Sequence, residues 1–129
     1  MVATQYVKSY ESYDFETARN GNEALKVVRE KAKEGIFFDI ILMDCNMPFM
    51  DGYEATKQLL ALADFGDIPF PYIIGLSANT SSSDVEYCYY VGMNDYLFKP
   101  VQKSLLEQKM KDSLRRPRVS KLDSDITSL

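Results

Sequence analysis

The sequence predicts a single α/β domain in which a doubly wound parallel sheet carries helices on both faces. Short apolar runs alternate with longer segments of helical periodicity along most of the chain. The runs are nearly continuous in apolar residues, as is typical of strands that are buried on both faces. Because parallel neighbours need crossover connections, strands that alternate with helices indicate a parallel sheet. A length of 129 residues with 46% hydrophobic residues is sufficient for one core.

The N-terminal part of the chain predicts two helices and a strand. Apolar side chains at helical spacing over residues 2–10 indicate a short amphipathic helix that begins almost at Met1. Residues 13–17 alternate aromatic or β-branched side chains with acids, which is the period of a half-covered strand. Asn20-Gly21 predicts a turn, and Asn22 is the predicted N-cap of a helix that ends at Gly35.

The central strand is predicted from the run that starts at Phe37 and ends at Asp44. A turn over residues 48–52 follows it, and apolar spacing over residues 53–63 predicts the next helix. The loop after that helix is rich in residues that break regular structure. We expect its two phenylalanines, Phe65 and Phe70, to pack locally.

The C-terminal half repeats the alternation of strand and helix. Residues 72–76 predict a second buried strand that ends at Ser77, and residues 84–91 predict a helix with an N-cap among the serines 81–83 and an end at Gly92. Residues 95–98 predict the last strand, which Lys99 follows. The final helix is expected over residues 102–114, with one side formed by Leu105, Leu106, Lys109 and Met110.

Three polar side chains follow three of the predicted strands directly. Asp44, Ser77 and Lys99 each stand where a strand ends, and the carboxyl ends of parallel strands meet at the edge of the sheet where ligands bind. A carboxylate can attack phosphorus, an amine can neutralise phosphoryl oxygens, and a hydroxyl can donate a hydrogen bond to one of them. Each residue alone is better explained as an ordinary cap or surface residue. Their joint placement at one edge predicts phosphoryl chemistry.

Composition excludes several other classes of function. A net charge of −4 gives no basis for direct binding to nucleic acid or to an anionic membrane surface. No apolar run is long enough for membrane insertion and no secretory signal is present, so we expect a cytoplasmic location. The chain has no histidine, which excludes histidine-based catalysis. Cys45 and Cys88 lack a metal-binding spacing and are expected to be reduced thiols.

Three stretches of the sequence resemble the receiver domain of two-component signalling. They are residues 39–55 (DIILMDCNMPFMDGYEA), residues 73–78 (IIGLSA) and residues 95–100 (DYLFKP), and residues 20–25 (NGNEAL) fit the same family. The residues of these motifs are most similar to those of receivers attached to hybrid sensor histidine kinases. The resemblance implies a flavodoxin-like fold over residues 1–116, with residues 117–129 as a flexible tail or linker.

Carried over by position, the resemblance implies a role for five residues. Asp44 is the expected phosphoacceptor, which takes a phosphoryl group from a histidine kinase or a histidine phosphotransfer domain. Ser77 and Lys99 are expected to hold the phosphoryl oxygens, and Asn46 to offer its backbone carbonyl to Mg²⁺. Tyr96 is expected to change rotamer when Ser77 closes on the phosphoryl group, as a switch that remodels a partner-binding face.

The sequence departs from the family at its start. Receivers begin with a central strand followed by a pair of acids that bind Mg²⁺ together with the phosphoacceptor, and this chain starts inside the helix after that pair. We therefore expect a fold truncated at the N-terminus, weak Mg²⁺ binding and impaired phosphorylation. A fragment, a divergent receiver-like module and a gap filled by another strand all fit this departure. The tail from Lys121 to Ile126 suits a linker better than such a strand.

Two other classes of function remain as alternatives. A phosphatase of the haloacid dehalogenase type also uses an aspartate at a strand end, but Asp44-Cys45-Asn46 lacks the second acid of that motif. A pseudo-receiver that binds a partner without phosphorylation fits the absent acid pair. The retained Asp44, Ser77, Tyr96 and Lys99 favour a phosphoacceptor, so we expect a signalling module rather than an enzyme.

Overall fold

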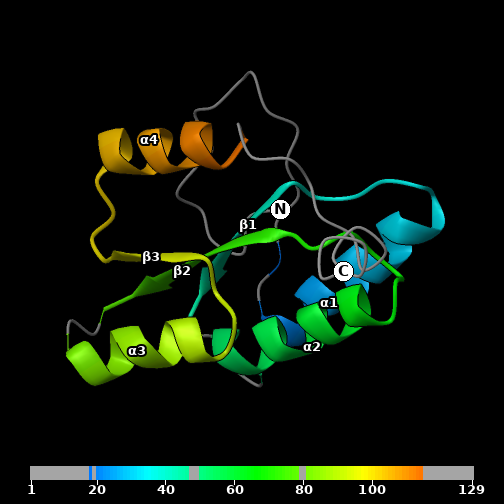
Figure 1. Ribbon diagram of the computed structural model, residues 1–129, viewed down its shortest axis with the longest axis horizontal. Helices are drawn as coiled ribbons and strands as arrows, with labels where there is room; N and C mark the ends of the chain where they lie inside the picture. The colour runs from blue at the N-terminus through cyan, green and yellow to red at the C-terminus, as the bar shows by residue number, and fades with distance from the viewer. Residues whose placement is uncertain (1–17, 19, 47–49, 79–80, 115–129) are drawn as a thin grey trace, which may run out of the picture.

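The computed structural model describes residues 18, 20–46, 50–78 and 81–114 (Figure 1). The expected helix over residues 2–10, the expected strand over residues 13–17 and the expected tail lie outside the described residues. Helices and strands alternate in the described part, as predicted. The elements are α1 (Gly21–Lys33), β1 (Ile40–Asp44), α2 (Gly52–Asp64), β2 (Tyr72–Ser77), α3 (Ser82–Tyr90), β3 (Asp95–Phe98) and α4 (Lys103–Leu114).

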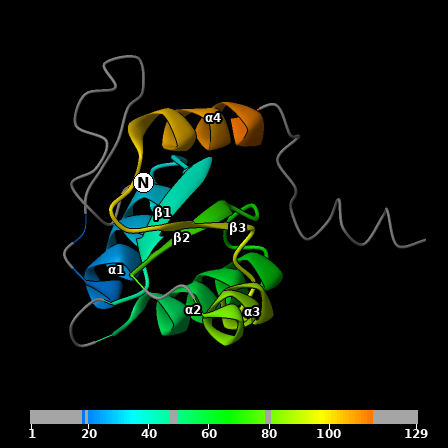
Figure 2. The same cartoon turned by 90° about the vertical axis from the view of Figure 1, so that its left-hand side faces the viewer.

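The three described strands form one parallel sheet in the order β1-β2-β3. Asp44 of β1 is level with Leu76 of β2, and Ser77 is level with Phe98 of β3. Helices α1, α2 and α3 cover one face of the sheet and α4 covers the other (Figures 1 and 2). The predicted doubly wound parallel architecture is confirmed, with three strands in the described part of the chain.

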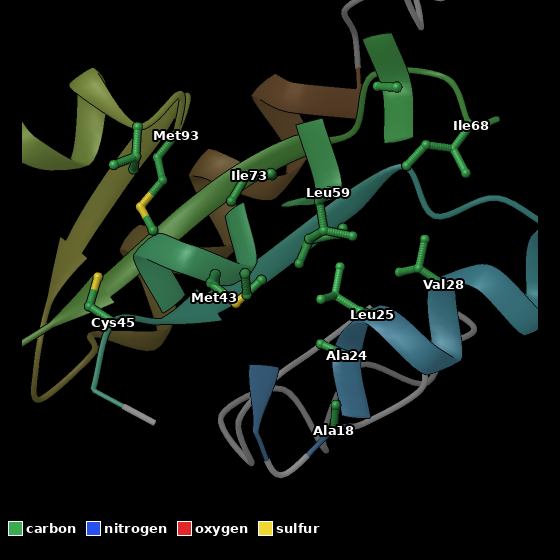
Figure 3. Packing of buried hydrophobic residues seen from close by; sticks show 14 of the residues in the cluster. Ala18, Ala24, Leu25, Val28, Met43, Cys45, Leu59, Ile68, Ile73 and Met93 are labelled. Atoms are coloured by element: carbon green, nitrogen blue, oxygen red, sulfur yellow. The ribbon is translucent and has the colours of Figure 1, made fainter. Parts of the chain in front are cut away.

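Alternate residues of β1 separate the core into two clusters. Ile41, Met43 and Cys45 pack with α1, α2 and α3 on one face (Figure 3), whereas Ile40 and Leu42 pack with α4 on the other. Period-two alternation in an extended strand sends neighbouring side chains to opposite faces. Both sets are apolar because both faces are covered, which explains the continuous apolar run.

The N-cap of α1 differs from the prediction. Asn20 has an extended backbone, and its side chain accepts a hydrogen bond from the Glu23 N–H at 2.9 Å. Asn22 instead lies inside the first turn and is exposed. Asparagine suits the cap because its side-chain oxygen satisfies an N–H that has no partner in the helix. The prediction of Asn22 as the N-cap was therefore wrong by two residues. Gly21, predicted to lie in a turn before the helix, is instead the first residue of α1.

Three further expectations about side chains were wrong. Phe65 is 81% exposed, whereas Phe70 packs against the core as expected. Leu105 is 45% exposed, because the buried side of α4 consists of Leu106, Met110 and Ser113. The apolar run before β1 starts earlier than the strand, and Phe37 lies at the surface. Residue type alone does not determine which side of a helix or which end of a run is covered.

The described helices are short, with nine to thirteen residues each. Gly35 and Gly92 follow α1 and α3 in the left-handed region, with φ of 77° and 107°, as expected for helix ends. Ser81 is the N-cap of α3, within the predicted serines. None of the helices in the part of the chain that the structure covers is long and apolar enough to cross a bilayer.

Candidate functional site

Asp44 and Lys99 meet at the carboxyl end of the sheet. Asp44 is the last residue of β1, and Lys99 follows the last residue of β3. The Lys99 Nζ lies 2.7 Å from both carboxylate oxygens of Asp44. Their side chains are 22% and 18% exposed, so the pair is partly screened from water but remains accessible from outside. The strand ends bring together two residues that are 55 positions apart.

The backbone around Lys99 is attached to β2. The Lys99 N–H donates to the Ser77 carbonyl oxygen at 2.8 Å, and the Lys99–Pro100 peptide bond is cis. Ser77 is the last residue of β2 and is only 3% exposed. Ser77 therefore ends the strand that lies between β1, which carries Asp44, and β3, which Lys99 follows.

The turn after β1 holds Asp44 from the other side. The Asn46 N–H donates to Asp44 Oδ1 at 2.9 Å. Asp51 is the N-cap of α2 and accepts from the Glu54 N–H at 2.9 Å. A Cβ on Gly52 would lie 2.3 Å from the Asp44 carbonyl oxygen, so only glycine permits this approach. The start of α2 is thus packed directly against the backbone of Asp44.

A buried pair of thiols lies beneath the site. Cys45 follows Asp44 and is 1% exposed, and Cys88 of α3 is 2% exposed. Burial raises the pKa of the Cys45 thiol to about 12, and the neighbouring Cys88 adds to this shift. Burial also raises the pKa of Tyr53, whose hydroxyl lies 4.0 Å from the Cys88 Sγ. A thiol with a raised pKa is a poor nucleophile at neutral pH, so Cys45 acts as apolar packing.

Tyr96 lies on β3, the outer strand of the described sheet on the side away from β1. It is level with Gly75 of β2 and is half-buried. Its ring contacts Tyr89 of α3 edge-on at 5.7 Å between centroids, and Phe98 at 5.2 Å. The ring thus connects α3 to β3, and both of its aromatic neighbours are exposed.

The described residues do not complete a magnesium site by themselves. Among them no group of three acids, cysteines or histidines is placed to hold a metal ion. Mg²⁺ requires six oxygen ligands in near-octahedral geometry. Asp44 supplies one carboxylate, and both of its oxygens already contact Lys99. Asn46, expected to contribute its carbonyl, is exposed.

The sequence predicted most of this arrangement but not the contact between the start of α2 and Asp44. Asp44 and Lys99 come together as expected from their strand ends, and Ser77 contacts Lys99 through a backbone hydrogen bond. The contact of Gly52 with the Asp44 carbonyl was not predicted, although Asp51-Gly52 before a helical segment is a recognisable N-cap signal. The close approach itself depends on how α2 packs, which the local sequence does not specify.

Comparison with known proteins assigns the chain to a family. Residues 1–111 match the family model described as the response regulator receiver domain. Hybrid signal transduction histidine kinase B of Dictyostelium discoideum is 40% identical over 111 residues, which cover 79% of this chain and 5% of that protein. Sensor histidine kinase RcsC of Salmonella typhimurium is 35% identical over 96 residues, which cover 74% of this chain and 9% of that protein. The chain therefore spans less than a tenth of the length of these relatives.

Solved structures show the same fold. The receiver domain of sensor histidine kinase PA1611 from Pseudomonas aeruginosa, which has a magnesium ion in its active-site cleft, is 30% identical with a TM-score of 0.65. That match covers 81% of this chain and 80% of that one. A CheY-like receiver protein from Methanospirillum hungatei is 27% identical with a TM-score of 0.65, covering 82% and 77% of the two chains. The chain belongs to the response regulator receiver domain family of two-component signalling.

Proposed function

We propose that this chain is a phosphoacceptor module of a phosphorelay and that Asp44 carries the phosphoryl group. The observation that supports this most strongly is the Lys99 amine, 2.7 Å from both oxygens of Asp44 at the carboxyl end of a parallel sheet. A phosphoryl group attached to Asp44 would lie within reach of the same amine. Family membership supports the same role.

In the proposed transfer the Asp44 carboxylate is the nucleophile. An Asp44 oxygen attacks the phosphorus of a phosphohistidine, and a P–O bond forms as the P–N bond breaks. The imidazole leaves with the electron pair and takes up a proton. Lys99 neutralises charge on the phosphoryl oxygens, and the Ser77 hydroxyl donates a hydrogen bond to one of them.

The proposed partners follow from the chemistry and the relatives. The proposed donor is a histidine kinase or a histidine phosphotransfer domain, because relatives that match this chain are named as histidine kinases. The proposed location is the cytoplasm. Mg²⁺ is the proposed cofactor, with Asp44 and the Asn46 carbonyl among its ligands. Since the described residues offer one carboxylate, we expect slow phosphorylation that needs high Mg²⁺ concentrations.

The proposed output is a change on the surface formed by α3, β3 and α4. Tyr96 would rotate when Ser77 closes on the phosphoryl group, and its contacts with Tyr89 and Phe98 would change with it. Lys109 of α4 binds Asp95 of β3 at 2.7 Å and would anchor the other side of this surface. We propose residues 1–116 as the unit that switches and residues 117–129 as its linker.

A pseudo-receiver that binds its partner without phosphorylation is the second candidate. The observation that favours it is that the described residues place a single carboxylate at the site, with both oxygens in contact with Lys99. In that case Asp44→Asn would leave partner binding unchanged. In the proposed function, the same variant abolishes the difference between binding before and after phosphodonor treatment.

The test is phosphoryl uptake by the chain and by matched variants. The chain is incubated with phosphoramidate and Mg²⁺, and its intact mass is measured before and after hydroxylamine, which cleaves acyl phosphates. We expect one hydroxylamine-sensitive phosphoryl group on the wild type, none on Asp44→Asn and a slower rise for Ser77→Ala. An unmodified wild type at every Mg²⁺ concentration would exclude the proposal, as would equal uptake by Asp44→Asn.

A further inference from the structure

Three positively charged side chains form a basic stripe along one face of α1. Lys26, Arg29 and Lys33 are exposed, and at about 100° per residue they fall within an arc of about 60° around the helix. In the described part of the chain, the side chains of the basic stripe make no ion pair or hydrogen bond. Lys31 of the same helix, by contrast, pairs with Glu34 at 3.8 Å.

The stability of the helix does not account for the basic stripe. Arg29 and Lys33 are four positions apart, and like charges at this spacing destabilise a helix. The helix dipole favours a base in the last turn, which accounts for Lys33 but not for Lys26 or Arg29. The whole chain carries a net charge of −4. Bases gathered without partners on one helix of an acidic chain therefore favour an acidic partner outside it.

An apolar hollow lies beside the C-terminal end of the same helix. It has a volume of about 240 Å³, is open to solvent, and is lined only by apolar residues, among them Val28, Ile36, Phe37 and Ile68. Figure 3 shows Val28 and Ile68 together at one end of the buried cluster. Ile36 and Phe37 are 48% and 36% exposed, so an approaching molecule can reach the hollow.

The size and place of the hollow suit one apolar side chain from a partner. Pockets that enclose a drug-sized molecule measure roughly 300–1,000 Å³, more than this hollow offers. Its residues from the loops precede β1 and β2, so it lies at the opposite edge of the parallel sheet from Asp44 and Lys99. Lys33 stands three residues before Ile36, which places the basic stripe within about 11 Å of the hollow.

We propose that the basic stripe and the hollow together bind an acidic segment of a partner protein. Carboxylates of the segment pair with the stripe, and one large apolar side chain of the segment enters the hollow. An apolar anchor in a pocket contributes most of the affinity of such interfaces, while the charges around it set orientation and association rate. The proposal does not depend on phosphorylation, because neither part of this surface includes Asp44, Ser77 or Lys99.

An acidic protein segment fits this surface better than other anionic partners. An anionic membrane takes up side chains that protrude from a protein, whereas the hollow is concave. Nucleic acid binds mainly through its phosphates, which use the bases but not the apolar lining. The net charge of −4 opposes both of these polyanions.

The test is the binding of designed peptides to the unmodified 129-residue chain, measured by fluorescence anisotropy at about 0.15 M salt. The probe carries several glutamates followed by one phenylalanine. Its matched controls replace the phenylalanine by alanine or the glutamates by glutamine. We expect saturable binding of the probe and binding about tenfold weaker or more for each control. No binding of the probe, or equal binding of either control, would overturn the proposal.

Variants of the chain locate the surface. Arg29→Glu should weaken binding of the probe about fivefold or more, whereas Lys111→Glu makes the same charge change on α4 and should leave it within about twofold. Phe37→Ala should weaken it as well, with the exposed Leu105→Ala of α4 as its control. Equal binding within either pair of variants would contradict the proposal.

Phosphatidylserine vesicles and duplex DNA test the other anionic partners. Both are titrated into the wild type and into Arg29→Glu under the same conditions. We expect neither to bind as tightly as the probe peptide. Tighter binding of vesicles or DNA that is lost in Arg29→Glu would overturn the assignment of this surface to an acidic protein segment.

Discussion

At the scale of single residues, Lys99 balances the charge of a partly buried carboxylate. Its amine contacts both oxygens of Asp44, and the two side chains are mostly covered. Leaving such a carboxylate without its cation costs more than an exposed ion pair contributes, because water only partly replaces the lost amine. The ion pair therefore contributes to stability as well as to the proposed chemistry.

Removing this amine should destabilise the fold. We expect Lys99→Met to lower the free energy of unfolding by about 1–3 kcal/mol, because hydrogen bonds to charged groups contribute amounts of that order. Lys111→Met is the control, because Lys111 is exposed on α4. Urea denaturation measures both variants. Equal stability of Lys99→Met and the control would show that the ion pair contributes nothing to the fold.

The Cys45 thiol predicts a loss of stability in alkaline solution. Its pKa is about 12 in the fold against 9.0 for the free group, mainly because it is buried. Above pH 9 the unfolded chain therefore binds fewer protons than the folded one, so the free energy of unfolding falls as pH rises from 9 toward 12. One thiol contributes a slope of at most about 1.4 kcal/mol per pH unit.

Urea denaturation across this pH range checks the expectation in the wild type and in Cys45→Ala. The variant should be less stable below pH 9, because it leaves a cavity, but its stability should fall less steeply above pH 9. Tyr53, whose pKa is also raised, leaves some slope in the variant. An identical slope in both proteins would exclude Cys45 as its origin.

At the scale of elements, the ends of the helices position the site. The N-cap of α1 at Asn20 and the N-cap of α2 at Asp51 both accept a backbone N–H at 2.9 Å. Each cap begins a helix beside the carboxyl end of β1, since Gly21 bonds to Met50 and Gly52 packs on Asp44. The turn that carries Asn46 is thus held between two helix starts.

The two asparagines near α1 offer a matched test of the cap. Asn20→Ala should lower the free energy of unfolding by about 1 kcal/mol, because it removes the acceptor of the Glu23 N–H. Asn22→Ala, in the exposed first turn, should change it by less than about 0.5 kcal/mol. Thermal or urea unfolding of both variants is sufficient. A larger loss of stability in Asn22→Ala than in Asn20→Ala would indicate that Asn22 is the N-cap.

Gly52 should tolerate no larger side chain. A Cβ there would meet the Asp44 carbonyl at 2.3 Å, and backbone cannot move aside as a flexible side chain can. We expect Gly52→Ala to cost about 1–3 kcal/mol of stability and to slow phosphoryl uptake, because Asp44 must shift. The exposed Ser82→Ala at the start of α3 is the control. A fully stable and active Gly52→Ala would show that the approach is not required.

At the scale of the whole molecule, the sequence predicts the features that follow from the hydrophobic periodicity and from the positions where strands end. The apolar runs predict a parallel sheet with two covered faces, and the residues after the strands predict the Asp44–Lys99 contact, because both follow from general geometry. The exposure of Phe65, the choice of Asn20 over Asn22 and the approach of Gly52 to Asp44 depend on packing between distant segments. Local residue types are compatible with several arrangements at each of these positions, so only the structure shows which one forms.

The most direct test of the account is to identify the residue that carries the phosphoryl group. After phosphodonor treatment, borohydride reduction converts a phosphorylated aspartate to homoserine, and peptide mass spectrometry locates the converted residue. The account predicts homoserine at position 44 alone, with none in Asp44→Asn. Conversion at another acid in the wild type, or no conversion anywhere, would contradict the assignment of Asp44 as phosphoacceptor.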